Sequence, residues 1–333
     1  MRFSKFISDL LLSACFSSSF VLPAHAADTI AIKSFPIPQF KVGSDETDFG
    51  SFRFMGGLEL TSENELLGAM SGIRFFANRQ DFIGVTDTGL WYKGQLVRDQ
   101  NNSPSSVAEF QMAPMRNKDG IATGSKWEFD AEGIALKGDK VFVSFERLAR
   151  IDGFPLDGVF TSAATETVPV QIPASEFRRN GGLEALATAP VNSPLKGALL
   201  AFSESSVDKN GNLFAAITSG PMAGVFAVKR DAPFNITDAD FLPDGDLLLL
   251  ERRFNIAIGI GMRIRKIKGA DIKVGALVDG EVLLDVGAGF QIDNMEGMSV
   301  TKDEAGQIYV TLISDDNHSF LQRNLLLEFK LIE

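Results

Sequence analysis

Acidic residues recur beside short apolar segments in this chain of 333 residues. The clearest copy, ITDADFLPDGDLLLLERRF at 236–254, begins with the acids Asp238 and Asp240 and continues through a Pro-Asp-Gly turn. Its four-leucine run then ends directly at Glu251 and Arg252. An apolar run bounded by such a turn is typical of a buried strand whose charged end is exposed. The unit therefore consists of an acidic residue, a turn, a buried strand and a second acidic residue.

Four other stretches carry related patterns, and their lead residues are Ser71, Glu132, Glu184 and Glu296. With Asp240 as the lead of the clearest copy, the spacings are 61, 52, 56 and 56 residues. Such a period fits one four-stranded β-propeller blade. Because blades are related by rotation about one axis, equivalent acids are predicted to form two rings at one mouth of the central channel. The predicted ring acids are Glu132, Glu146, Glu184, Glu204, Asp240, Glu251, Glu296, Asp315 and Asp316.

Rings of carboxylates would suit a hard cation such as calcium, which takes about six to eight oxygen ligands. We therefore predict that the ring acids hold calcium, which can polarise a phosphoryl or carbonyl oxygen and activate water. Glu132 and Glu251 are the predicted catalytic acids, and Arg147 and Arg252, each directly after a ring acid, are predicted to contact an anionic substrate. In the alternative interpretation, the acids bind no metal and only pair with these arginines at the blade edges.

Other catalytic chemistries are poorly represented in the sequence. His318 is the only histidine beyond residue 26, and its polar DDNHS stretch is typical of an exposed loop, although a base beside Asp316 is the alternative. Residues 68–72, GAMSG, lack the Gly-x-Ser-x-Gly spacing of a nucleophile elbow. With one histidine and no cysteine after residue 26, a zinc site is not expected either.

The elements that must position these residues are predicted to be strands. Apolar segments of strand length, such as 141–145, 198–202 and 308–313, are bounded by Gly, Asp, Asn or Pro. We expect an all-β fold, a β-propeller of five to six four-stranded blades closed by pairing of its N- and C-terminal strands. The strand near 29–38 is expected to complete the blade that the last repeat begins. The segment 52–60 is left over and keeps the blade count open.

The first 26 residues have the features of a secretory signal peptide. A basic start and an apolar stretch precede Ala24-His25-Ala26, a small-x-small cleavage site. We expect cleavage after Ala26, a single propeller domain over 27–333, and a periplasmic or secreted protein. In the alternative, Leu12-Ser13-Ala14-Cys15 is a lipoprotein processing site and Cys15 carries the anchor. No later stretch has the ~20 apolar residues of a transmembrane helix.

Several motifs together resemble the bacterial phytase-like family. They are GGLEL at 56–60, VTDTG at 85–89, DAEGIAL at 130–136, GGLEAL at 181–186, NMEGMSV at 294–300 and the stretch at 236–254. The resemblance covers essentially the whole chain after residue 26 and implies an exported β-propeller with esterase-like activity. The Asp-rich and Asn-rich signature segments of calcium-dependent β-propeller phytases are absent, so the resemblance does not extend to phytate hydrolysis.

Two functions are consistent with these observations. The first is an exported, calcium-binding propeller hydrolase that acts on phosphate esters or related esters at the channel mouth. The alternative is a non-catalytic envelope propeller that binds a protein or cell-envelope ligand there. The formal charge of −11 argues against nucleic acid as a partner, and we expect a monomer that binds a small anionic ester or an envelope component.

Overall fold

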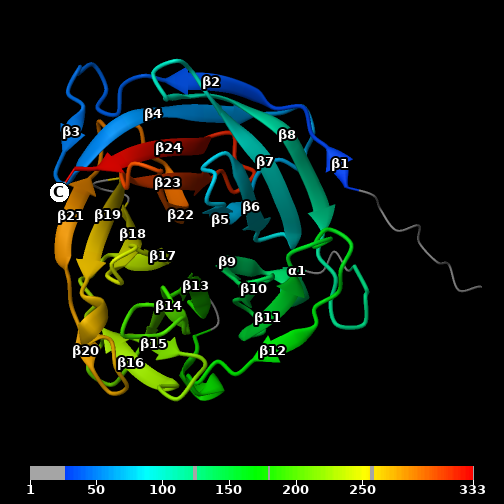
Figure 1. Cartoon of the computed structure of the whole chain (residues 1–333), viewed down its shortest axis with the longest axis vertical. Helices are drawn as coiled ribbons and strands as arrows, with labels where there is room; N and C mark the ends of the chain where they lie inside the picture. The colour runs from blue at the N-terminus through cyan, green and yellow to red at the C-terminus, as the bar shows by residue number, and fades with distance from the viewer. Residues whose placement is uncertain (1–26, 123–125, 179–180, 256–258, 333) are drawn as a thin grey trace, which may run out of the picture.

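The chain forms five β-sheets arranged around one axis, which is the architecture of a five-bladed β-propeller (Figure 1). The computed structural model describes residues 27–122, 126–178, 181–255 and 259–332. The predicted signal peptide at 1–26, including the alternative anchor Cys15, lies outside the described residues. The prediction of an all-β propeller is confirmed, and the blade count is five.

Each blade runs from an inner strand at the channel to an outer strand at the rim (Figure 1). The first blade holds β5 (Met70–Phe75), β6 (Asp81–Thr86), β7 (Leu90–Arg98), β8 (Pro104–Pro114) and β1 (Asp28–Thr29). The second holds β9 (Ala131–Lys137), β10 (Lys140–Phe145), β11 (Arg150–Pro155) and β12 (Glu166–Val168). The third holds β13 (Leu183–Thr188), β14 (Leu199–Val207), β15 (Leu213–Ile217), β16 (Gly224–Val228) and the parallel β20 (Leu277–Val278).

The fourth blade holds β17 (Asn235–Phe241), β18 (Leu247–Asn255), β19 (Gly259–Ile267) and β21 (Glu281–Val286). The fifth holds β22 (Asn294–Lys302), β23 (Ile308–Asp315), β24 (Asn324–Leu331), β4 (Phe52–Thr61) and β2 (Lys33–Ile37), with β3 (Asp48–Phe49) beside β4. Helical segments among the described residues are short: α1 (Lys126–Phe129) and two 3-10 turns at Ala174–Glu176 and Gly269–Asp271. None of the described helices has the length and apolar character needed to cross a membrane.

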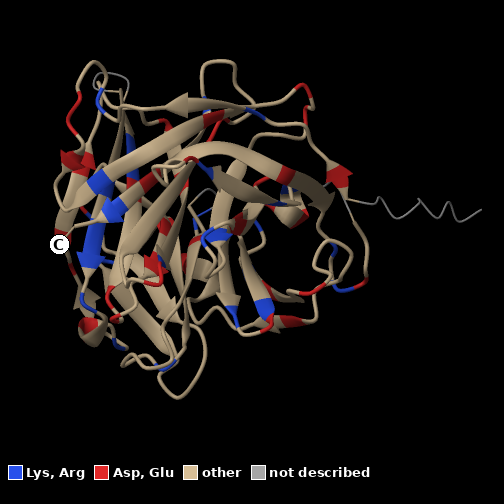
Figure 2. Cartoon of the chain, turned by 45° about the horizontal axis from the view of Figure 1, so that its top comes forward, with Lys and Arg blue, Asp and Glu red and all other residues tan. Residues whose placement is uncertain are grey.

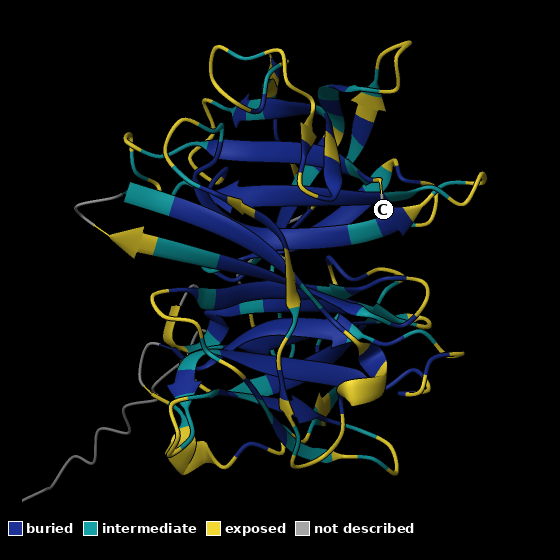
Figure 3. Cartoon of the chain, turned by 90° about the vertical axis from the view of Figure 1, so that its left-hand side faces the viewer, coloured by how far each residue is buried: buried dark blue, intermediate teal, exposed yellow. Residues whose placement is uncertain are grey.

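The four-leucine run shows why these sequences form strands that are buried on both faces. All four side chains, Leu247 to Leu250, are fully buried in β18. Successive side chains of a strand point to opposite faces. Leu248 and Leu250 therefore pack with residues of the fifth blade, whereas Leu247 and Leu249 pack with residues of the third. Each sheet is covered by a neighbour on both sides, and exposed residues lie mainly in the loops (Figure 3).

The ring closes between β4 and the C-terminal strand β24, which pair antiparallel in the fifth blade. The expected closing strand near 29–38 is thus in the correct blade but in the outer position, since β2 pairs with β4. The segment 52–60, left over in the sequence interpretation, is the strand that completes the ring. Gly57 permits this close pairing, because a Cβ there would lie 2.6 Å from Leu327 Cδ2 and 3.0 Å from the Leu326 carbonyl oxygen.

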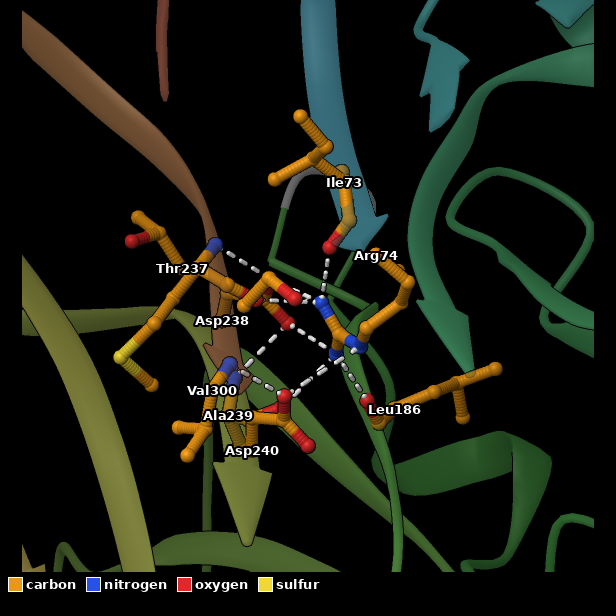
Figure 4. A network of polar contacts seen from close by, with 12 residues as sticks. Ile73, Arg74, Leu186, Thr237, Asp238, Ala239, Asp240 and Val300 are labelled. Carbon is orange, nitrogen blue, oxygen red and sulfur yellow. Dashed lines mark hydrogen bonds and ion pairs between the residues drawn. The ribbon is translucent and has the colours of Figure 1, made fainter. Parts of the chain in front are cut away.

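Arg74 crosses the central channel and connects four blades (Figure 4). From β5, its Nη1 and Nη2 donate to the Asp238 carboxylate of the fourth blade at 2.7 and 3.0 Å. Nη1 also donates to the carbonyl of Met298 in the fifth blade at 2.6 Å, and Nη2 to that of Leu186 in the third at 2.7 Å. Both charged side chains are almost completely buried. The guanidinium therefore fills the channel between the inner strands.

We expect Arg74→Met to destabilise the protein by about 3–5 kcal/mol, because it leaves the Asp238 and Asp240 carboxylates without their buried cation. Urea unfolding followed by circular dichroism measures the change. Arg53→Met is the matched control, since Arg53 pairs with Asp48 at the exposed surface and its loss should change stability little. Equal stability of the two variants would contradict a central role for Arg74.

Candidate functional site

Each inner strand carries a β-bulge near its first residue, at the same end of the channel. The ladder between the first two strands of a blade shifts between Met70 and Gly72 in β5, and equivalent shifts occur in the other four blades. A bulge re-aims a side chain. Here four of the five bulged residues line the channel mouth, and the fifth, Thr237, is buried and donates to the Met295 carbonyl. We call this set the first ring, and its members are Ser71, Glu132, Glu184, Thr237 and Glu296.

A second ring lies beside the first at the end of the second strand of each blade. Each member directly follows the residue that pairs with the one just before the bulge, and the members are Asp87, Glu146, Glu204, Arg252 and Asp315. Both rings therefore have an exception in the fourth blade. Thr237 stands where the other blades place glutamate or serine, and Arg252 stands where they place an acid. Figure 2 shows the acidic residues of the chain, among them some near the centre of the ring.

Three predicted ring acids lie elsewhere. Asp240 is three residues further along β17 than Thr237 and lies near Arg74, with its Oδ2 4.0 Å from Arg74 Nε. Glu251 is buried within the fourth blade, where Arg263 Nε and Arg265 Nη2 donate to it at 2.8 and 2.6 Å. The sequence pattern equates Asp240 and Glu251 with acids of the other blades, but the strand pairing places Thr237 and Arg252 at those equivalent positions. Neither side chain lines the channel mouth.

The third acid, Asp316, holds the loop between β23 and β24. Its Oδ1 accepts a hydrogen bond from the Ala69 amide at 3.2 Å, and its Oδ2 accepts one from Asn324 Nδ2 at 2.7 Å. His318 lies with Asp316 beside a separate surface hollow that faces the loop 60–67. Ser62 and Ser319 line the same hollow, but their hydroxyls contact the backbone: Ser62 Oγ donates to the Ala31 carbonyl at 2.8 Å, and Ser319 Oγ accepts from the Leu321 amide at 3.3 Å.

Eight of the predicted residues converge on one cavity of about 690 Å³ at the channel mouth, which we call the acidic cavity. These eight are Glu132, Glu146, Arg147, Glu184, Glu204, Arg252, Glu296 and Asp315. The sequence interpretation did not select Asp87, Asp130 or Lys126, which also line it. A signal for two of them was present, because Asp87 ends the weakest repeat and Asp130 begins the DAEG motif.

Crowding of carboxylates and burial disfavour negative charge in the acidic cavity. Burial, with the neighbouring charges of Asp130 and Asp87, raises the pKa of Glu132 well above its usual value. Burial, with the charge of Glu132, does the same to the pKa of Glu184. The pKa of Glu296 rises to about 7 and that of Asp315 to about 8, in both cases chiefly through burial.

Three cations partly offset this charge. Arg252 Nε lies 3.0 Å from Glu296 Oε1 and its Nη2 lies 3.6 Å from Glu204 Oε1, so this arginine joins the two rings. Burial lowers the pKa of Arg252, but the charges of Glu296 and Glu204 outweigh that effect and leave it raised. On the opposite side, Arg147 Nε donates to Asp130 Oδ2 at 2.7 Å, and Lys126 pairs with Asp87 and Asp130.

The remaining oxygens fit a divalent cation. Asp130, Glu132 and Glu146 form one trio and Glu146, Glu184 and Glu204 form another, and in each the three candidate ligand atoms lie within 4.8 Å of one another. Oxygens bound to one calcium ion at ~2.3–2.6 Å are separated by at most about 5 Å, so either trio meets that limit.

Unpartnered oxygens support the same interpretation. Asp130 Oδ1 and Asp87 Oδ1 are buried and accept no hydrogen bond among the described residues, and Asp130 Oδ1 has only the ion-pair contact with Lys126 Nζ at 3.6 Å. A buried acceptor without a partner costs free energy that a bound cation would recover. The donor set consists of oxygens alone, which suits calcium or magnesium rather than zinc.

The fold and this site define a class of protein, a five-bladed β-propeller with an acidic cavity at one mouth of a blocked channel. Residues 65–318 match the family described as "Phytase-like: Esterase-like activity of phytase". This match covers well over half of the chain, and the protein belongs to that family. The resemblance inferred from the motifs is thereby confirmed. A search of curated proteins gave no significant match.

Similar solved structures come from proteins of diverse kinds. U3-55K has 8% sequence identity and a TM-score of 0.39, over 80% of this chain and 96% of the other. A chain of the nidogen/laminin complex has 12% identity and a TM-score of 0.39, over 80% and 86%. The PQQ-bound aldose sugar dehydrogenase from Streptomyces coelicolor has 12% identity and a TM-score of 0.39, over 90% and 99%. At these TM-scores the similarity carries no information on function.

We expect the protein without divalent cations to lose stability as the pH rises from about 4 to about 8. Carboxylates of the acidic cavity have a raised pKa in the folded state, so in this window the folded protein binds more protons than the unfolded chain and the free energy of unfolding falls. Thermal unfolding in a chelator across this pH range measures the slope.

Asp315→Asn should flatten that slope, because it removes the group whose pKa rises to about 8. Glu63→Gln, which removes one negative charge from a side chain that is 90% exposed, is the matched control. Added calcium should reduce the loss at pH 8 by favouring the ionised carboxylates. A melting temperature that rises with pH in the chelator would contradict this electrostatic description.

Proposed function

We propose that this protein is a divalent-cation-dependent hydrolase, calcium being the expected cation, that acts on phosphate esters or related esters in the acidic cavity. The observation that carries the proposal is the pair of carboxylate trios, which share Glu146 and lie beside buried acidic oxygens without hydrogen-bond partners. The family description, which names an esterase-like activity, supports the same reaction class. Two trios that share one carboxylate offer places for one cation or for two.

The cation and the protein side chains have separate tasks in this proposal. A bound calcium ion would be held by the trios and would supply Lewis-acid polarisation of the ester oxygen. Glu132 and Glu184 accept no hydrogen bond from the described side chains or amides, and the raised pKa of each favours its protonated form. They belong to different trios, so the glutamate whose trio does not hold the cation can act as general acid or base.

Arg252 and Arg147 lie at opposite sides of the cavity and orient the substrate. Arg252 is three-quarters buried between Glu204 and Glu296 and presents a fixed positive charge to an anionic ester group. Arg147 retains 37% exposure and uses only its Nε in the bond to Asp130, so its terminal nitrogens are available to a ligand. Arg74 fills the channel below, which confines the substrate to the mouth.

We further propose export of the protein to the periplasm or the medium after cleavage at Ala26, with anchoring through Cys15 as the alternative. The basic start, apolar stretch and Ala-His-Ala site support export. A carboxylate cation site of moderate affinity also suits a compartment in which calcium is abundant. Mass determination of the mature protein from a cell envelope fraction would distinguish a free Ala27 N-terminus from a lipidated cysteine.

We expect turnover of para-nitrophenyl phosphate or para-nitrophenyl acetate with calcium and none after chelation. Glu132→Gln and Glu184→Gln should each lower kcat/KM by about 100-fold, the scale of lost general acid–base catalysis. Glu63→Gln on the exposed loop is the control and should leave kcat/KM unchanged. Steady-state kinetics with purified full-length mature protein provide the measurement.

Two other results would contradict parts of this proposal. A calcium-dependent rise in melting temperature without turnover of any ester would favour the non-catalytic alternative, a propeller that binds an envelope ligand at the same mouth. Activity that survives both glutamate substitutions and chelation would overturn the assigned site.

A further inference from the structure

A groove in the second blade adjoins the acidic cavity and has the opposite charge. It has a volume of about 800 Å³ and is formed by α1, by the loop between β10 and β11, and by the segment that follows β12. The two hollows share Glu146 and Arg147 as wall residues, so a molecule of modest size can extend from one into the other. We call this hollow the blade-2 groove.

Three arginines make the blade-2 groove basic within an acidic protein. Arg147 is held by Asp130 through its Nε alone. Arg150 is held by Asp152 at 2.8 Å and stacks on the Phe145 ring at 3.7 Å, while its Nη1 is buried and has no hydrogen-bond partner among the described residues. Arg178 is exposed and forms no ion pair within the described part of the chain, and its amide is fixed by Ser206 Oγ at 2.9 Å. Arg147 and Arg178 therefore line the groove with guanidinium donors that are not used within the described part of the chain.

Apolar side chains form the rest of this groove. Trp127 is 59% exposed and Leu148 is 42% exposed, and Phe177 is half-buried beside them. An indole ring that remains exposed next to arginines is suited to stack on a flat apolar group. Such a surface combines aromatic contact with the planar, two-pronged recognition of a carboxylate by arginine.

We propose that the blade-2 groove binds an aromatic group that carries a carboxylate. The inference rests on the proposed function, because this aromatic group is taken to be the leaving group of the ester. The scissile bond of that ester lies in the acidic cavity. The substrate class is then an aryl ester with an anionic ring substituent. In hydrolysis of its phosphate, water forms a bond to phosphorus, the bond between phosphorus and the aryl oxygen breaks, and the phenol leaves with a proton.

The binding step can be tested without turnover, by calorimetry of the mature protein with para-nitrobenzoate and with neutral para-nitrobenzyl alcohol. We expect para-nitrobenzoate to bind in calcium and in chelator, and the alcohol to bind about tenfold more weakly. Trp127 supplies a second readout, because the other tryptophan, Trp91, is fully buried. Binding should therefore protect tryptophan fluorescence from quenching by iodide.

Arg178→Gln and Trp127→Ala should each weaken para-nitrobenzoate binding by about tenfold, the scale of one lost charge-assisted hydrogen bond or stacking contact. Arg53→Gln, at an exposed pair far from the groove, is the matched control. Because Arg178 is exposed, its substitution should not disturb folding, and an unchanged melting temperature verifies this. Binding that is equal for acid and alcohol, or unaffected by Arg178→Gln, would overturn the proposal.

Kinetics separate this inference from the proposed hydrolysis. With calcium, kcat/KM for para-carboxyphenyl phosphate should exceed that for phenyl phosphate, and Arg178→Gln should remove the difference without changing turnover of phenyl phosphate. Selective benzoate binding without any turnover would overturn the hydrolase and retain the groove as an anionic-aryl site. Turnover with equal kcat/KM for the two phosphates and without benzoate binding would support the proposed hydrolysis. It would overturn the proposal for the blade-2 groove.

Discussion

The ion pair between Arg74 and Asp238 on the propeller axis is the interaction on which the rest of the structure depends. Two buried charges incur a desolvation cost, which attraction alone seldom offsets. Here carbonyls of the third, fourth and fifth blades accept the remaining guanidinium hydrogens, so the charge is fully solvated by protein. Burial raises the pKa of Asp238 to about 6 against the lowering effect of Arg74, and the Met298 amide donates to the same carboxylate. Four of the five blades thus share one polar centre.

This arrangement requires that one blade depart from the repeat. Asp238 directly follows the bulge residue of β17, and the equivalent positions in the other blades are Gly72, Gly133, Ala185 and Gly297. The small residues allow inner strands to approach closely, since a Cβ on Gly133 would lie 2.3 Å from the Glu184 carbonyl oxygen. The Asp238 carboxylate can therefore lie on the axis only because the other four blades have no large side chain at the equivalent position. The fourth blade also contributes Arg252 to the second ring, which gives the acidic cavity one positively charged side.

The acidic cavity concentrates carboxylates whose burial and mutual repulsion are unfavourable for the folded protein. Their raised pKa values show that negative charge is disfavoured there, and natural proteins retain such conflicts mainly at functional sites. A cation would relieve the conflict, and the adjacent blade-2 groove provides the complementary charge for an anion. The two hollows meet at Glu146 and Arg147, one acid and one base that are adjacent in the chain. These two adjacent residues thus separate the proposed cation site from the proposed anion site.

The sequence by itself determined the strands, the repeat and most of the acidic cavity, because apolar runs, turn residues and a period of 52 to 61 residues are local or periodic signals. Tertiary structure decided which residues of each blade belong to the two rings at the channel mouth. In the fourth blade the strand pairing aligns Thr237 and Arg252, rather than Asp240 and Glu251, with the ring residues of the other blades, so Asp240 lies near Arg74 and Glu251 lies inside the blade. Closure by Phe52–Thr61 rather than by the strand near 29–38, and the convergence of Asp130 with Glu146, depend on contacts between distant segments. Contacts of this kind do not produce a repeated pattern in the sequence.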